Sequence, residues 1–158
     1  MGAMNDVERL VATEQIRALI ATYAISFDDH DWERFGELWA EEAAFVVDGQ
    51  AFEGREAVLE FLTTCLPDDY GGKHMNSPPL IEVAPDGESA TAQTDVVWIP
   101  QNFENAIVAR YHDTFVRRDG RWLFVRRDEK PLPYKPGPPP MSVTAVGVSG
   151  ATMRTEGA

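Results

Sequence analysis

Two residues that stand far apart in the sequence, Asp28 and His74, could together form an acid–base pair. Asp28 follows the apolar stripe of an expected helix at its C-terminal end, where a carboxylate opposes the helix dipole and calls for a compensating partner. An imidazole is such a partner, and His74 stands near the start of an expected strand. A carboxylate that binds one ring nitrogen fixes the tautomer of the imidazole and leaves the other nitrogen free to accept a proton. The pair could therefore act as a general base.

Simpler interpretations of both residues stay open at this point. Asp28 is also typical of a solvated, capping acidic turn that it would form with Asp29 and Asp31. A lone histidine such as His74 is often a surface or core residue without a chemical role. Alternation along the strand places His74 and Asn76 on one face, so Asn76 joins the candidates for substrate binding.

The elements that must position this pair begin with three helices. After a short turn, Thr13 is expected to cap a helix, Asp31 a second one, and a third is expected over about residues 55–66. The first helix is indicated by apolar residues at three- and four-residue spacing: Ile16, Leu19, Ile20, Tyr23 and Phe27. A short hairpin of residues 44–47 and 51–53 is expected around the turn dipeptide Asp48-Gly49.

Long strands are expected in the rest of the chain, over residues 73–83, 89–99, about 106–118, and 121–128. Asp119-Gly120 suits the two-residue turn between the last two strands. Helices followed by antiparallel strands favour an α+β fold. We expect a cone-shaped α+β barrel, with three N-terminal helices packed in a strongly curved mixed or antiparallel sheet and a pocket at the mouth of the cone.

Composition limits the classes of partner. The chain has 158 residues and a formal net charge of −12, which argues against nucleic acid and anionic membranes, because both require a basic face. Cys65 is the only cysteine, so no intramolecular disulfide and no cysteine metal cluster can form. No apolar run approaches a membrane span and no signal-peptide pattern opens the chain, so we expect a cytoplasmic protein.

The expected domain organisation is simple. Residues 1–3 resemble a vector remnant, residues 4–133 are expected to form one domain, and residues 134–158 form a tail rich in proline and glycine. Because proline fixes φ and donates no hydrogen bond, the start of this tail is expected to be extended. The tail could be disordered, a lid, or a strap across a neighbouring subunit.

Several motifs in order resemble the SnoaL-like branch of the nuclear transport factor 2-like superfamily over about residues 8–127. They are Tyr23, Asp28 and Asp31-Trp32, then Phe52-Glu53-Gly54-Arg55-Glu56-Ala57, then His74, and finally Phe115-Val-Arg-Arg-Asp-Gly-Arg-Trp122. By motif, the chain is similar to scytalone dehydratase, hexachlorocyclohexane dehydrochlorinase and bile-acid 7α-dehydratase. In those families an Asp–His dyad abstracts the proton, and Asp28 and His74 stand at the matching places.

The resemblance also implies roles for other residues. Tyr23 matches the tyrosine that precedes the aspartate of the bile-acid enzyme, and Arg127 matches a pocket arginine of the dehydrochlorinase. Tyr111 is expected to face the pocket, and Phe27 and Val47 stand where scytalone dehydratase has two tyrosines. Pro100 or Gln101 takes the place of that enzyme's second histidine. A simple proton abstraction, followed by elimination or isomerisation, is therefore expected instead of a water-assisted dehydration.

Val96 and Trp98 are candidates for substrate binding, and if they face the pocket, alternation along the strand turns Asp95 away from it. By the resemblance His112 lies on the outer face, where sheets of this kind often form homodimers.

The leading hypothesis is a cofactor-free lyase or isomerase, of the dehydratase, isomerase or cyclase type, that uses no metal. Its substrate would be a small, largely apolar cyclic molecule. A non-catalytic domain that binds a small hydrophobic ligand is the first alternative, and a subunit-association domain of the same fold is the second.

Overall fold

The computed structural model describes residues 4–66, 70–104 and 106–132. The expectations for the vector remnant at residues 1–3 and for the tail at residues 134–158 lie outside the described residues.

The first helix, α1 (Asp6–Asp28), is longer at its start than the sequence pattern predicted. Asn5 is its N-cap: the Asn5 side chain accepts a hydrogen bond from the Glu8 backbone N–H, and the Glu8 carboxylate accepts one from the Asn5 backbone N–H. This reciprocal capping box satisfies N–H groups that a helix start otherwise leaves unpaired. Thr13 is therefore an interior helix residue, and the prediction that it caps the helix was wrong.

Two shorter helices follow. Asp31 caps α2 (Trp32–Gly36) as expected, because its side chain accepts a hydrogen bond from the Arg34 backbone N–H. The third helix, α3 (Arg55–Thr64), packs against the first two strands, β1 (Trp39–Val47) and β2 (Gln50–Glu53).

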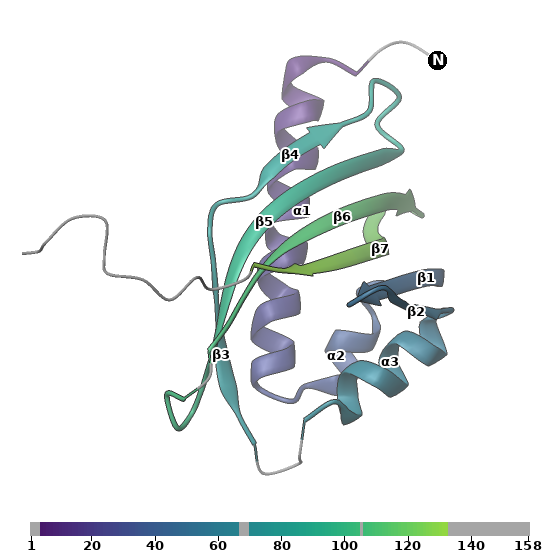
Figure 1. Ribbon diagram of the computed structural model, residues 1–158. Coiled ribbons are helices and arrows are strands. Elements are labelled where there is room, and N and C mark those ends of the chain that lie inside the picture. Colours follow the sequence, from purple (N-terminus) through teal and green to yellow (C-terminus); the bar gives the residue numbers. More distant parts are fainter. Residues whose placement is uncertain (1–3, 67–69, 105, 133–158) are drawn as a thin grey trace, which may run out of the picture.

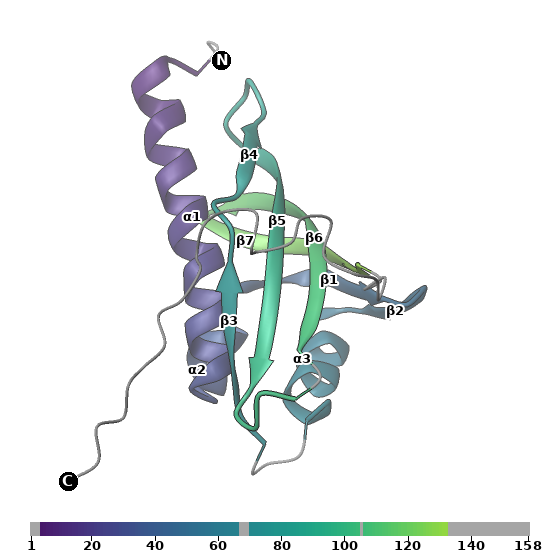
Figure 2. The same ribbon diagram turned by 60° about the vertical axis from the view of Figure 1, so that its left-hand side comes forward.

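One seven-stranded sheet forms the rest of the described fold. Its remaining strands are β3 (Gly72–Asn76), β4 (Leu80–Val83), β5 (Ser89–Pro100), β6 (Ile107–Arg118) and β7 (Arg121–Pro131). The order is β2-β1-β7-β6-β5-β3, with β4 also paired to β5; only β1 and β7 run parallel. The sheet curves strongly around α1 without closing into a complete barrel (Figures 1 and 2). The α+β class and the mixed curved sheet agree with expectation.

The segment expected as one strand over residues 73–83 is two strands, β3 and β4. Pro78 and Pro79 interrupt it, because proline has no backbone N–H for the ladder. Both pieces pair with the same long strand, β5.

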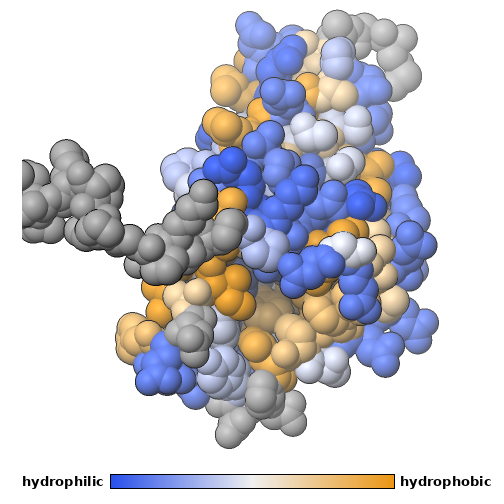
Figure 3. All heavy atoms as spheres, in the orientation of Figure 1, coloured by the Kyte–Doolittle hydropathy of each residue, from blue (hydrophilic) through white to orange (hydrophobic). Residues whose placement is uncertain are grey.

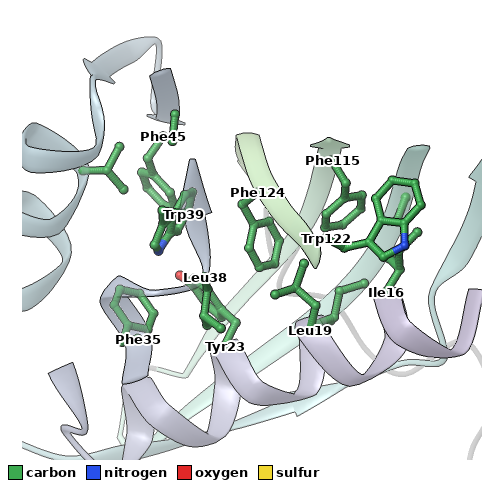
Figure 4. Packing of buried hydrophobic residues seen from close by; sticks show 14 of the residues in the cluster. Ile16, Leu19, Tyr23, Phe35, Leu38, Trp39, Phe45, Phe115, Trp122 and Phe124 are labelled. Atoms are coloured by element: carbon green, nitrogen blue, oxygen red, sulfur yellow. The ribbon is translucent and has the colours of Figure 1, made fainter. Parts of the chain in front are cut away.

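The core fills the space between α1 and the concave face of the sheet. Ile16, Leu19 and Tyr23 of α1 point toward Phe115, Trp122 and Phe124 of β6 and β7, and all of these side chains are buried (Figure 4). This packing fixes the end of α1 relative to the strands, and so positions Asp28.

Candidate active site

Asp28 holds His74 by two hydrogen bonds. The Nδ1 atom of His74 lies 2.6 Å from Oδ1 of Asp28, and the backbone N–H of His74 donates to Oδ2 of Asp28 at 2.9 Å. The two side chains are only 4% and 5% exposed. A carboxylate bound to Nδ1 fixes that nitrogen as the N–H donor and leaves Nε2 as the proton acceptor.

Local structure explains this contact. Asp28 is the last residue of α1, and His74 lies at the centre of β3, an edge strand of the sheet. A second contact ties the same two elements together, since the Lys73 ammonium donates to the Asp29 carboxylate at 3.0 Å. The unfavourable position of Asp28 at a helix C-terminus is therefore offset by the N–H donors of β3.

A cavity of about 210 Å³ opens beside His74. It is below the range of about 300–1,000 Å³ that is usual for drug-sized ligands, so it suits a small molecule. Figure 3, which has the orientation of Figure 1, shows a hollow in the lower half of the molecule, with hydrophobic residues gathered around it. Most lining residues are apolar or aromatic: Tyr23, Phe27, Phe45, Val47, Phe61, Leu62, Cys65, Leu66, His74, Val96, Trp98, Ile107, Tyr111 and Glu129.

Four of the predicted substrate-binding residues line this cavity: Tyr23, Val96, Trp98 and Tyr111. The other two, Asn76 and Arg127, are not among its lining residues. Asn76 is the last residue of β3, and its side-chain Oδ1 is buried without a hydrogen-bond partner among the described residues. A direct contact of Asn76 or Arg127 with a molecule in this cavity is therefore not favoured.

Arg127 instead lies behind the cavity wall. Its guanidinium is fully buried and donates to both carboxylate oxygens of Asp113, from Nε at 2.7 Å and from Nη2 at 2.8 Å. It stacks between the rings of Tyr23 and Tyr111, at 4.0 and 3.9 Å from their centroids. Burial alone would lower the pKa of Arg127, but the attraction of Asp113 outweighs it and raises that pKa, so the side chain stays charged.

The two tyrosines therefore present their hydroxyl-bearing rings to the cavity from a fixed support. Burial raises the pKa of both Tyr23 and Tyr111 above the ordinary tyrosine value, against the opposing effect of the Arg127 charge. Both phenols are neutral donors near pH 7. The Tyr111 hydroxyl lies 3.5 Å from Nε2 of His74, at the long limit for a hydrogen bond, so this nitrogen is only weakly engaged.

The outer face of the sheet carries the residues that were expected to point away. The Asp95 carboxylate accepts two hydrogen bonds from Arg110, at 2.6 and 3.1 Å, and both side chains are about half exposed. His112 stands between the buried residues Tyr111 and Asp113 on β6, so its side chain points to the opposite face of the sheet from theirs. Neither Asp95 nor His112 lines the cavity beside the dyad.

Glu129 and Cys65 line the cavity but were missed by sequence reasoning. The expected last strand ended at residue 128, whereas β7 continues to Pro131. The pairing of β6 with β7 also shifts register: Thr114 pairs with Arg126, whereas the next residue of β6, Phe115, pairs with Phe124. This shift changes which residues of β7 point into the fold. A simple alternation from Phe124 would have turned Glu129 outward.

No group of three or more histidine, cysteine, aspartate or glutamate side chains is placed to hold a metal ion in the part of the chain that the structure describes. Among the helices of residues 4–66, none is long and apolar enough to cross a membrane.

Comparison with known proteins gives consistent results. The SnoaL-like domain family matches residues 8–128. Gamma-hexachlorocyclohexane dehydrochlorinase of Sphingobium indicum is 24% identical over 131 residues, which cover 79% of this chain and 83% of the enzyme.

Two solved structures are also similar. Rv3472, a protein of unknown function from Mycobacterium tuberculosis, has a TM-score of 0.73 and 27% identity, with 83% of this chain and 78% of that chain covered. An NTF2-like protein with a cystatin-like fold from Novosphingobium aromaticivorans has a TM-score of 0.69 and 28% identity, covering 91% and 92% of the two chains.

The family match extends from α1 to β7 and includes both Asp28 and His74. The chain therefore belongs to the SnoaL-like domain family, within the nuclear transport factor 2-like superfamily.

Proposed function

We propose that this protein is a cofactor-free lyase or isomerase in which the Asp28–His74 dyad removes a proton from a small, largely apolar, cyclic molecule. The observation that carries the proposal is the placement of the dyad: Nδ1 of His74 is bound by a buried carboxylate, while the imidazole lines an apolar cavity. A positioned base of this kind typically accelerates proton transfer by ~10²–10⁴-fold.

The apolar lining supports a substrate whose acidic proton is on carbon. A proton next to a carbonyl or a leaving group is removed most easily when the negative charge that develops is stabilised by a hydrogen bond. The phenols of Tyr23 and Tyr111 line the same cavity and are neutral donors, so they are the groups we assign to the substrate oxygen. The role that the resemblance implied for Arg127 becomes an indirect one, which is to support the two rings.

The relatives fit a lyase. A dehydrochlorinase that is 24% identical along most of its length eliminates a leaving group, and such an elimination can start with the proton transfer assigned here to His74. The substrate of that relative is not assigned to this chain. The cavity volume of about 210 Å³ also argues against a domain that only associates with another subunit and fills its own pocket. A cytoplasmic location and a homodimer through the outer sheet face stay predictions.

A deuterium wash-in experiment tests the base without knowledge of the natural substrate. Cyclohexanone is incubated with the protein in D₂O, and the loss of its α-protons is followed by proton NMR. We expect wild type to catalyse the exchange and His74→Ala to lose about 100-fold or more of the rate above background.

His112→Ala is the matched control, since that histidine does not line the cavity, and it should keep wild-type exchange. If His74→Ala retained the wild-type rate within about threefold, His74 would not be the base. If wild type bound the ketone without exchanging its protons, the non-catalytic ligand-binding alternative would replace the proposal.

A further inference from the structure

We propose that Glu129 is a second acid–base residue of this pocket, which protonates the departing oxygen while His74 removes the proton from carbon. This inference rests on the proposed function and narrows it. It names an oxygen leaving group, a hydroxyl on the carbon β to a carbonyl, as the group that the site is built to release.

The position of Glu129 on β7 supports this role. Glu129 is paired in register with Tyr111 of β6 on one side and with Val47 of β1 on the other, and all three residues line the cavity. The hydroxyl of Tyr111 reaches to 3.5 Å from Nε2 of His74. Tyr111 therefore lies between the two titratable groups, and a molecule in the cavity has His74 and Glu129 on its walls.

The surroundings of Glu129 favour a carboxyl that keeps its proton. Burial raises the pKa of Glu129, the Arg127 charge opposes this, and the Asp48 carboxylate adds to it. Arg127 is already engaged by both oxygens of Asp113. The other titratable groups that face Glu129 are Tyr23 of α1, Tyr111 of β6 and Cys65 at the end of α3, and none of them is a cation.

No hydrogen bond or ion pair of the Glu129 carboxyl is found within residues 4–66, 70–104 and 106–132. A partly buried carboxyl without a protein partner is a group available to a substrate, because burying a polar group without a partner is otherwise unfavourable. Raised carboxyl pKa values in clefts mark candidate general acids on the same physical grounds.

The reaction balances without a cofactor. Nε2 of His74 takes the proton from the carbon next to the carbonyl, and the C–H electron pair becomes the new C=C bond. The bond from the β-carbon to oxygen breaks, and the Glu129 carboxyl gives its proton to that oxygen, which leaves as water. His74 is then protonated and Glu129 ionised, and exchange with solvent returns each of them to its starting state.

The choice of leaving group follows from this step. A hydroxide ion is a poor leaving group, so a hydroxyl departs only when it receives a proton, whereas chloride departs without one. Loss of the Glu129 proton should therefore affect the release of water and leave the release of chloride nearly unchanged.

Two matched ketones test this difference. 3-Hydroxycyclohexanone and 3-chlorocyclohexanone both give cyclohex-2-enone, whose ultraviolet absorbance is followed after subtraction of the uncatalysed rate. We expect Glu129→Gln to lose about 100-fold or more of the rate for the hydroxy ketone and to stay within about threefold for the chloro ketone. Glu60→Gln, at an exposed position of α3, should match wild type with both.

The outcomes separate the two proposals. If Glu129→Gln lowered both rates equally or lowered neither, Glu129 would not be the acid, while loss of both rates in His74→Ala would keep the proposed function intact. If wild type eliminated neither ketone, the proposed function would fail and this inference with it.

The pKa of the Glu129 carboxyl, measured on the protein without substrate, is an independent test of the proposed acid. The side-chain carboxyl carbon of Glu129 is identified in ¹³C-glutamate-labelled protein by its absence in Glu129→Gln, and its NMR shift is followed against pH. We expect an apparent pKa above the ordinary value of 4.5. A value at or below 4.5 would overturn the role of Glu129 as an acid, whatever substrate is used.

Discussion

Removal of the Asp113 carboxylate should leave the Arg127 guanidinium charged, buried and unpaired. Arg127 is 0% exposed, and Asp113 accepts two hydrogen bonds from it and supplies the carboxylate that balances its charge. Among the described residues, the Nη1 atom of Arg127 already lacks a hydrogen-bond partner. Breaking a buried ion pair by removing one partner typically lowers the free energy of unfolding by about 3–5 kcal/mol. We expect Asp113→Ala to fall in that range.

Urea denaturation followed by tryptophan fluorescence measures the effect. With a slope m of about 2 kcal/mol per molar urea, the unfolding midpoint should fall by about 1.5–2.5 M. The control is Asp95→Ala, which breaks the geometrically similar pair with Arg110 on the exposed face. Water solvates the freed Arg110, so this variant should move the midpoint far less.

The double variant Asp113→Ala/Arg127→Met separates charge from packing. It removes the unpaired charge and places an apolar side chain between the two tyrosine rings, so it should recover most of the lost stability. The reasoning would be refuted if Asp113→Ala lowered the free energy of unfolding by less than about 1 kcal/mol. It would also be refuted if the double variant were as unstable as the single one.

Three further predictions concern other parts of the structure. Burial raises the folded-state pKa of Glu129, so the protonated carboxyl contributes stability that is fully present below pH 4.5 and is lost as the pH rises through the raised value. Glu129→Gln should therefore gain stability relative to wild type as the pH rises from 4 to 8, and a constant difference in urea midpoints would contradict this. A Cβ atom on Gly72 would overlap the Trp98 ring and lie 2.8 Å from the Ile99 carbonyl oxygen, so Gly72→Ala should displace the indole in the cavity wall and shift tryptophan emission, whereas Gly71→Ala should not. Asn5→Ala removes the helix cap and should lower the free energy of unfolding by about 1 kcal/mol in the same urea assay, and an unchanged midpoint would show that the cap contributes nothing.

Local patterns were sufficient for much of the fold, whereas the contact between Asp28 and His74 was left open by the residues alone and was favoured by the resemblance. The apolar stripe of α1 ends next to Asp28, and the alternation of β3 places His74 and Asn76 on one face, but neither pattern shows that the two side chains meet. The cap at Asn5 was missed because the pattern around Thr13 looked like an equally good start. The strand break at Pro78 was missed because the hydrophobic alternation resumes immediately after it.

The rest of the site depends on information that periodicity does not carry. The register shift opposite Phe124 changes which residues of β7 face inward, and only the pairing of β6 with β7 reveals it. Arg127 lies beyond this register shift, so periodicity did not indicate where its side chain points, and only the resemblance suggested a pocket residue. The sequence could not show that Asp113 would hold the guanidinium behind the cavity wall.

The double attachment of His74 to Asp28 also bears on how related sequences are interpreted. β3 is an edge strand, and an exposed edge can pair with other chains and lead to aggregation. The Asp28 carboxylate ties this edge to α1 through the backbone N–H of residue 74, a bond that any residue except proline could make. Selection for a soluble, correctly assembled protein would therefore keep an aspartate at position 28 even in a homologue that had lost its reaction. A retained aspartate without the histidine is then a sign of an intact fold and no sign of an enzyme.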